Sequence, residues 1–98
     1  MTVKAIKELG RIPVNSTGSM STSFEDGAIK LYSYNTIVGY IKNGRAVIVN
    51  GGYSQTTATH LSNYRDSYSV NKDDTFEYEA FIKRAELDEV NVLGGWNN

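Results

Sequence analysis

Three short runs rich in isoleucine, valine and tyrosine occupy the middle of the chain, at residues 28–34, 36–42 and 45–50. Asn43-Gly44 lies between the second and third runs, and this dipeptide favours the type I′ turn of a two-residue hairpin. Both alternating faces of residues 36–42 and 45–50 are apolar, which indicates a sheet covered by helix on one side and partly covered on the other. The pattern predicts an α+β fold around a three-stranded antiparallel sheet with a central Asn-Gly hairpin.

Apolar residues at helical spacing predict two to three short helices that pack on this sheet. One is expected at residues 2–10, where Gly10 suits a left-handed exit, and a second runs from Thr56 or Thr57 to Tyr68. A third follows Asp73-Asp74-Thr75, because acidic residues favour a first turn. Its apolar stripe consists of Tyr78, Phe81, Ile82 and Ala85.

Residues 76–87 also fit a strand, since Phe76, Tyr78, Ala80 and Ile82 alternate. Strong helix formers fill most of the other positions, which favours the helix.

The remaining segments have little to bury. Residues 11–14 are expected to be extended at a sheet edge, because Pro13 lacks a backbone donor. The polar stretch at about residues 15–24 is predicted to be a flexible loop, and residues 89–93 a short strand. Gly94-Gly95 then begin a flexible tail at about residues 94–98.

Length and composition fit a single domain over residues 1–98. Ten Lys and Arg against eleven Asp and Glu give a net charge of −1, which argues against a partner recruited by bulk positive charge. With no cysteine, one histidine and no calcium-loop spacing at Asp73-Asp74, we expect no metal ion and no cofactor. No apolar run is long enough to span a membrane, so a soluble cytoplasmic protein is expected.

His60 is the single histidine and the best catalytic candidate. Ser54 and Asp66 supply the other residue types of a triad, but Asp66 follows six residues later on the same predicted helix and cannot orient the imidazole. Packing beside the helix start, near Thr56 and Thr57, is therefore the favoured role of His60. The sequence predicts no catalytic residue and no enzymatic activity.

Seven tyrosines and one tryptophan are the most informative part of the composition, because exposed aromatic and arginine side chains dominate binding hot spots. For any single tyrosine, a place at the rim of a small core is the simpler interpretation. For the set, a partner-binding surface is an equal alternative. We expect Trp96 to dock on its own domain or across a dimer. The candidate partner-binding residues are Tyr32, Tyr34, Tyr40, Arg45, Tyr53 and Trp96.

Part of the chain resembles a family of small, uncharacterised proteins common in phages and other mobile elements. The resemblance covers about a third of the chain, in the segments Ser33-Tyr34-Asn35-Thr36-Ile37-Val38-Gly39-Tyr40, Val47-Ile48-Val49-Asn50 and Tyr53-Ser54-Gln55-Thr56-Thr57-Ala58-Thr59-His60. The family pattern is a Ser-Tyr-x-Thr-x-Val-Ala strand, a hairpin and a Tyr-Ser-x-Thr-Thr-x-x-His helix start, and Gly39 stands where it has alanine. The resemblance implies an accessory phage gene and a hairpin–helix core.

These features predict a phage-encoded protein of the host cytoplasm that acts by stoichiometric protein binding. By analogy of class with small anti-CRISPR proteins, its expected partner is a host defence nuclease such as Cas, and a homodimer is the alternative assembly. The second hypothesis is a nucleic-acid-binding protein that uses basic residues near Tyr32 and Tyr40. A simpler interpretation of these basic residues is a scatter of surface charges. The residues are Lys4, Lys7, Arg11, Lys30, Lys42 and Arg45. An acidic face at Asp73, Asp74, Glu77 and Glu79 has a solvated helix start as its simpler interpretation.

Overall fold

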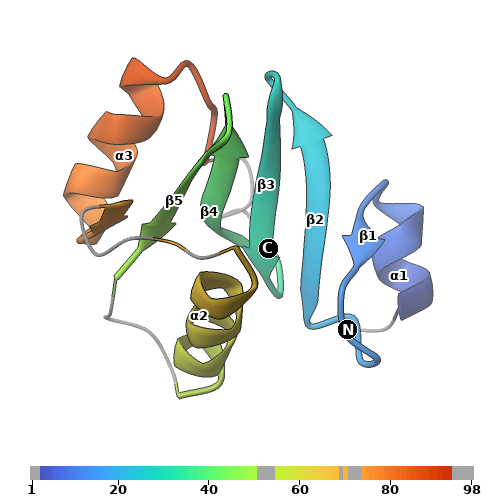
Figure 1. The fold of residues 1–98 in the computed structure, drawn as a ribbon. Helices are drawn as coiled ribbons and strands as arrows, with labels where there is room; N and C mark the ends of the chain where they lie inside the picture. The colour runs from blue at the N-terminus through green and yellow to red at the C-terminus, as the bar shows by residue number, and fades with distance from the viewer. Residues whose placement is uncertain (1–2, 51–54, 69, 71–73, 94–98) are drawn as a thin grey trace.

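The computed structural model describes residues 3–50, 55–68, 70 and 74–93. Within them the chain forms a six-stranded sheet and three α-helices (Figure 1). No helix in the described part of the chain is long and apolar enough to cross a membrane. The elements are α1 (Val3–Glu8), β1 (Ile12–Pro13), β2 (Met20–Glu25), β3 (Ala28–Ser33), β4 (Thr36–Lys42), β5 (Arg45–Val49), α2 (Gln55–Tyr68), β6 (Thr75–Phe76) and α3 (Tyr78–Leu87).

The strands lie in the sheet in the order in which they occur in the chain. Strands β1 to β5 form an antiparallel meander, and β6 pairs in parallel with β5 at the far edge. Asn43 and Gly44 have φ values of 54° and 77°, so the expected two-residue hairpin turn between β4 and β5 is confirmed. Asp26 and Gly27, with φ values of 57° and 70°, make a similar turn between β2 and β3.

The expected three-stranded sheet is wrong, because the polar stretch predicted as a loop contains β2. This strand lies between β1 and β3, so its main-chain groups pair within the sheet. Its short hydroxyl side chains can be buried when they find partners, as Ser23 Oγ does 3.1 Å from the hydroxyl of Tyr32. A strand that buries small polar side chains shows no alternation of apolar and polar residues. The hydrophobic pattern of the sequence therefore does not predict β2.

The two short strands at the sheet edges account for the rest of the difference. Pro13 lies in the edge strand β1, as expected from its missing donor. Phe76 lies in β6 rather than in a helix, while the helical interpretation of the following residues is confirmed by α3. Residues 89–93 form no strand, although Val90 and Val92 are buried against the core.

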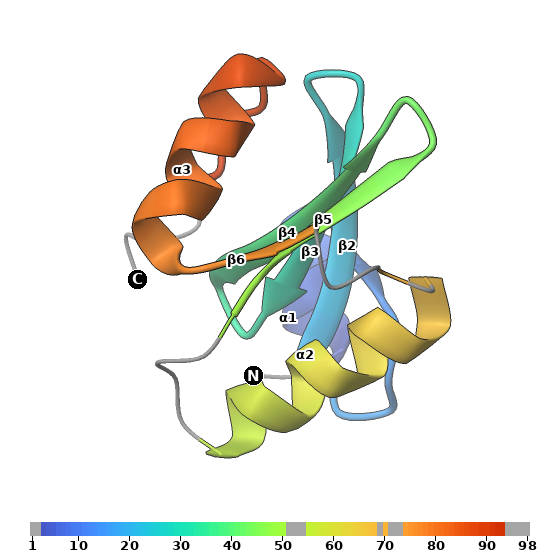
Figure 2. The same cartoon turned by 60° about the vertical axis from the view of Figure 1, so that its left-hand side comes forward.

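Helices cover both faces of the sheet (Figure 2). Cross-strand pairs share a face, so the register assigns Leu31 and Ser33 to one face and Tyr32 and Tyr40 to the other. Helix α2 packs on the first face, where His60 bonds Ser33. Helix α3 packs on the second, where the ring of Phe81 lies 6.0 Å from that of Tyr40.

Candidate functional site

Three segments that are far apart in the sequence meet around the imidazole of His60. Ser33, at the end of β3, places its Oγ 2.7 Å from His60 Nδ1 and 3.0 Å from Thr57 Oγ1. Ser19, in the turn before β2, places its Oγ 3.3 Å from His60 Nε2. The ring of Tyr34 lies 5.5 Å from the imidazole. Four of these residues, Ser33, Tyr34, Thr57 and His60, lie in the Ser33–Tyr40 and Tyr53–His60 segments singled out in the sequence.

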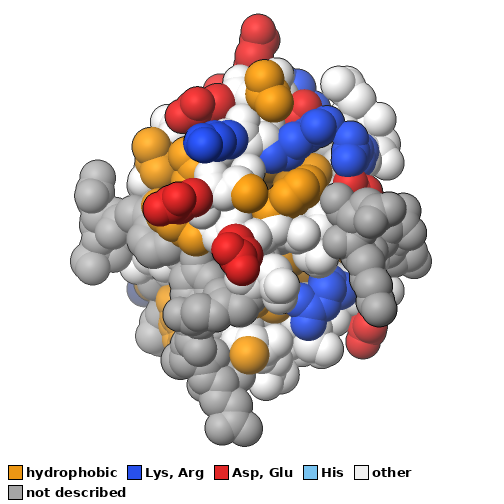
Figure 3. Space-filling view, turned by 90° about the vertical axis from the view of Figure 1, so that its left-hand side faces the viewer, with side chains coloured by type: hydrophobic (Ala, Val, Ile, Leu, Met, Phe, Trp, Pro, Cys, Tyr) orange, Lys and Arg blue, Asp and Glu red, His pale blue; other side chains and the backbone are white. Residues whose placement is uncertain are grey.

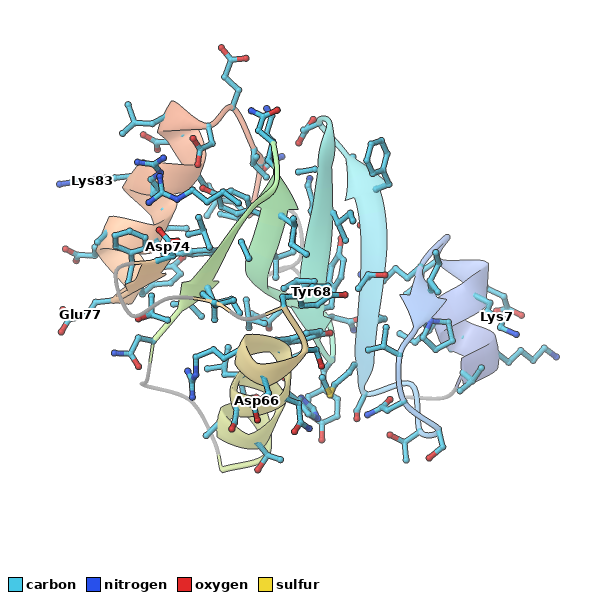
Figure 4. All side chains as sticks on the ribbon, in the orientation of Figure 1. Lys7, Asp66, Tyr68, Asp74, Glu77 and Lys83 are labelled. Atoms are coloured by element: carbon cyan, nitrogen blue, oxygen red, sulfur yellow. The ribbon has the colours of Figure 1, made fainter. Side chains whose placement is uncertain are left out.

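The chemistry of this cluster favours a structural role over catalysis. Burial lowers the pKa of His60, so the imidazole is neutral near pH 7. Its hydrogen-bond partners among the described residues are hydroxyl groups, and no carboxylate orients it as in a triad. Ser19 Oγ also lies 2.8 Å from Asn15 Nδ2 and 2.9 Å from Thr17 Oγ1, which fills the hydrogen-bonding capacity of a hydroxyl. Asp66 lies exposed on α2 (Figure 4).

Tyr34 is the exposed member of the cluster and has a strained backbone. Its φ is 55°, which is uncommon for an aromatic residue, and 42% of the residue is exposed. Its amide donates to Ser19 O at 2.7 Å, and Arg11 Nη1 approaches its carbonyl at 3.4 Å. The contacts around His60 therefore hold the turn between β3 and β4 in one conformation and present the Tyr34 ring to solvent.

The predicted partner-binding residues do not lie on one surface. Tyr32 and Tyr40 are 5% and 1% exposed and belong to the core on the α3 face. Tyr34 is exposed beside α2, and the half-exposed Arg45 is paired with Asp74 (Nε–Oδ1 2.8 Å). Tyr53 and Trp96 lie outside the described residues.

Four of the basic residues considered for nucleic-acid binding are held by intramolecular contacts. Lys30 is buried with its Nζ 3.0 Å from Asp26 Oδ2, and Lys42 Nζ donates to Asp88 O at 2.6 Å. Arg45 pairs with Asp74, and Arg11 lies over the ring of Tyr32. Lys7 points into solvent from α1 (Figure 4).

The acidic residues considered as a separate face are interspersed with other side chains. Asp74 bonds Arg45, and Glu77 and Glu79 lie exposed at the start of α3. On this side of the molecule, acidic, basic and apolar side chains alternate (Figure 3). Asp73 lies outside the described residues.

An apolar row crosses the part of the sheet that α2 leaves uncovered. Phe24 pairs with Ile29, Ile29 with Ile41, and Ile41 with Ala46, so these four side chains share one face across four strands. Phe24 is 74% exposed, and the other three are half-buried. Helix α2 lies over the opposite end of the same face, away from the β2–β3 and β4–β5 turns (Figure 1). We call Phe24, Ile29, Ile41 and Ala46 the open row.

One turn signal in the sequence predicts the open row, although residues 15–24 were expected to form a loop. Asp26-Gly27 is as strong a hairpin dipeptide as Asn43-Gly44. A hairpin centred on it pairs Phe24 with Ile29 and makes Phe24 part of the sheet face.

Residues 6–83 match the sequence model of DUF8033, a family of unknown function. This chain belongs to that family. The DUF8033 match extends from α1 into α3 and includes both the His60 cluster and the open row. No curated protein and no solved structure matches the chain. Among the described residues of this DUF8033 chain, no group of three His, Asp or Glu side chains is placed to hold a metal ion.

Proposed function

We propose that this protein acts by stoichiometric binding to another protein, without catalysis, and that the open row is its main contact surface. The exposure of Phe24 next to half-buried Ile29 and Ile41 is the observation that carries the proposal. Contiguous exposed apolar surface of this kind marks interaction sites in soluble domains. A phage origin and a host defence nuclease as the target are supported by the motif resemblance and the analogy of class described above.

The geometry of the open row favours an amphipathic helix of the partner. The row spans three strand spacings, roughly 14 Å, which matches a helix of about nine or ten residues. Helix α2 already packs on the same face through Leu61 and Tyr64, which are 2% exposed. The row contains no charged side chain, so the contacting stripe of the partner is uncharged as well.

The test is capture of a partner by the purified chain from a lysate of the host, followed by binding of the purified partner. We expect a saturable one-to-one complex. Phe24→Asp should abolish it, because a carboxylate within an apolar contact is desolvated without a partner.

Leu87→Asp is the matched control. Leu87 is 77% exposed, close to the 74% of Phe24, but it lies at the end of α3 and outside the open row. Both variants should melt near the unchanged protein, since neither side chain is buried. A complex that survives Phe24→Asp, or is lost equally with Leu87→Asp, would contradict the proposed surface.

A further inference from the structure

A cavity of about 430 Å³ lies beside β2, and Phe24 of the open row is among its lining residues. The N-terminal segment Leu9–Arg11 forms one wall, and Asn91 lies at another. Ser23, Lys30 and Tyr32 line it from β2 and β3, on the face that the register separates from α2. Its volume is within the range of small-molecule sites.

Two cationic side chains, Lys30 and Arg11, line the cavity, and within the described part of the chain only Lys30 forms an ion pair with a carboxylate. Lys30 has a side chain only 4% exposed, and its Nζ lies 3.0 Å from Asp26 Oδ2. Asp26 also accepts a hydrogen bond from the Asn91 amide, which together with Lys30 lowers the pKa of its carboxyl group. Lys30 is therefore neutralised within the chain.

Arg11 has no such partner. Its guanidinium lies 4.0 Å from the centroid of the Tyr32 ring, and Nη1 donates to Asn35 Oδ1 at 2.8 Å. No carboxylate of the described residues forms an ion pair with it. Its hydrogen bonds within the described residues use Nη1, so Nε and Nη2 can donate to the two oxygens of an oxyanion.

We propose that this cavity binds a small organic anion, whose carboxylate or phosphate group pairs with Arg11. The apolar part of the ligand lies against Ile37 and Leu9, which also line the cavity. Glu25 also lines the cavity, and its carboxylate lies 3.7 Å from Lys30 Nζ with 63% of its side chain exposed, so its charge is shared with Lys30 and screened by water. The cavity shares Phe24 with the open row, but the proposed anion pairs with Arg11, which is not part of that row.

The test is a titration of the ¹⁵N-labelled full chain with benzoate, phenyl phosphate and the neutral analogue benzamide, followed by NMR. Benzoate or phenyl phosphate should give saturable shifts at the amides of Gly10, Ser23 and Asn91. The comparison of the two shows which oxyanion the site takes. Benzamide should bind at least about tenfold more weakly, because it offers Arg11 no charge.

Arg11→Gln should weaken anion binding by about tenfold or more, while Lys7→Gln, which removes an exposed cation of α1, should leave it unchanged. Arg11 also bonds Asn35, so thermal melting must show that the variant is folded. The benzamide comparison uses the unchanged chain and decides the question even if Arg11→Gln unfolds. Equal binding of benzamide, shifts that never saturate, or a folded Arg11→Gln chain that binds as well would overturn the proposal.

Discussion

Ser33 Oγ and His60 Nδ1 lie 2.7 Å apart, although 27 positions separate the two residues in the chain. This bond joins the end of β3 to α2. Ser19 Oγ, 3.3 Å from His60 Nε2, links α2 to the turn before β2 as well. His60→Ala leaves the buried Ser33 hydroxyl without this partner and should lower the free energy of unfolding by about 1–3 kcal/mol. Any loss of partner binding should follow the loss of stability.

Urea denaturation and binding should be measured on the same His60→Ala preparation. Ser62→Ala, on the exposed side of α2, is the control. A variant with unchanged stability and no binding would indicate a direct functional role for His60.

The stability of the domain should depend on the protonation of His60. Burial lowers the folded-state pKa of His60 below the ordinary 6.5, so the unfolded chain takes up the proton first. The contribution of neutral His60 is therefore fully present above pH 6.5 and is lost as the pH falls below that value.

His60→Gln should reduce the slope of stability against pH between about pH 7.5 and pH 5. Urea midpoints at several pH values measure that slope. Equal slopes in the two proteins would show that His60 doesn't titrate differently on folding.

Tyr40 joins the middle of the sheet to the end of α3. Its buried hydroxyl donates to Asp88 Oδ2 at 2.5 Å, and Arg84 Nε donates to the same oxygen at 3.1 Å. Burial and the Asp88 carboxylate raise the pKa of Tyr40. Although burial acts in the opposite direction, the bonds from Tyr40 and Arg84 hold the pKa of Asp88 below its usual value.

Tyr40→Phe should lower the free energy of unfolding by about 1–3 kcal/mol, because it removes a hydrogen bond to a charged group. Tyr68→Phe, at a residue that is 38% exposed, should have little effect. Equal urea midpoints for Tyr40→Phe and the unchanged protein would contradict the importance of this bond.

Gly39 occupies a position where a side chain has no room. A Cβ there would lie 2.9 Å from Val47 O and 3.2 Å from Leu31 Cδ1. Gly39→Ala should therefore destabilise the domain by about 1–3 kcal/mol through a forced shift of β4 or β5. Thermal melting tests this, and an unchanged melting temperature would show that the strands adjust freely at this site.

Binding to DNA should be absent even at low salt. Lys30, Lys42 and Arg45 already bond Asp26, Asp88 and Asp74, and a net charge of −1 gives no attraction to phosphates. Fluorescence anisotropy with single- and double-stranded DNA over a salt series measures this. Salt-dependent binding would favour the nucleic-acid hypothesis instead.

Local signals in the sequence predict several of the elements correctly. The Asn43-Gly44 turn, the edge position of Pro13 and the three helices follow from turn chemistry and helical spacing, which need no information from distant residues. Asp26-Gly27 is an equally strong turn signal, and a prediction that includes this hairpin contains β2.

The burial of a strand or side chain depends on its partners in the folded chain and does not follow from local signals. Strand β2 is polar in sequence and is buried because β1 and β3 flank it. Tyr32 and Tyr40 are buried because helix, loop and strand segments from elsewhere in the chain cover their face, which composition can't reveal. Phe24 is exposed because α2 packs on the other end of its sheet face. Burial is a property of the neighbours that folding supplies, so which aromatic side chains are exposed follows from the fold and not from the residue types alone.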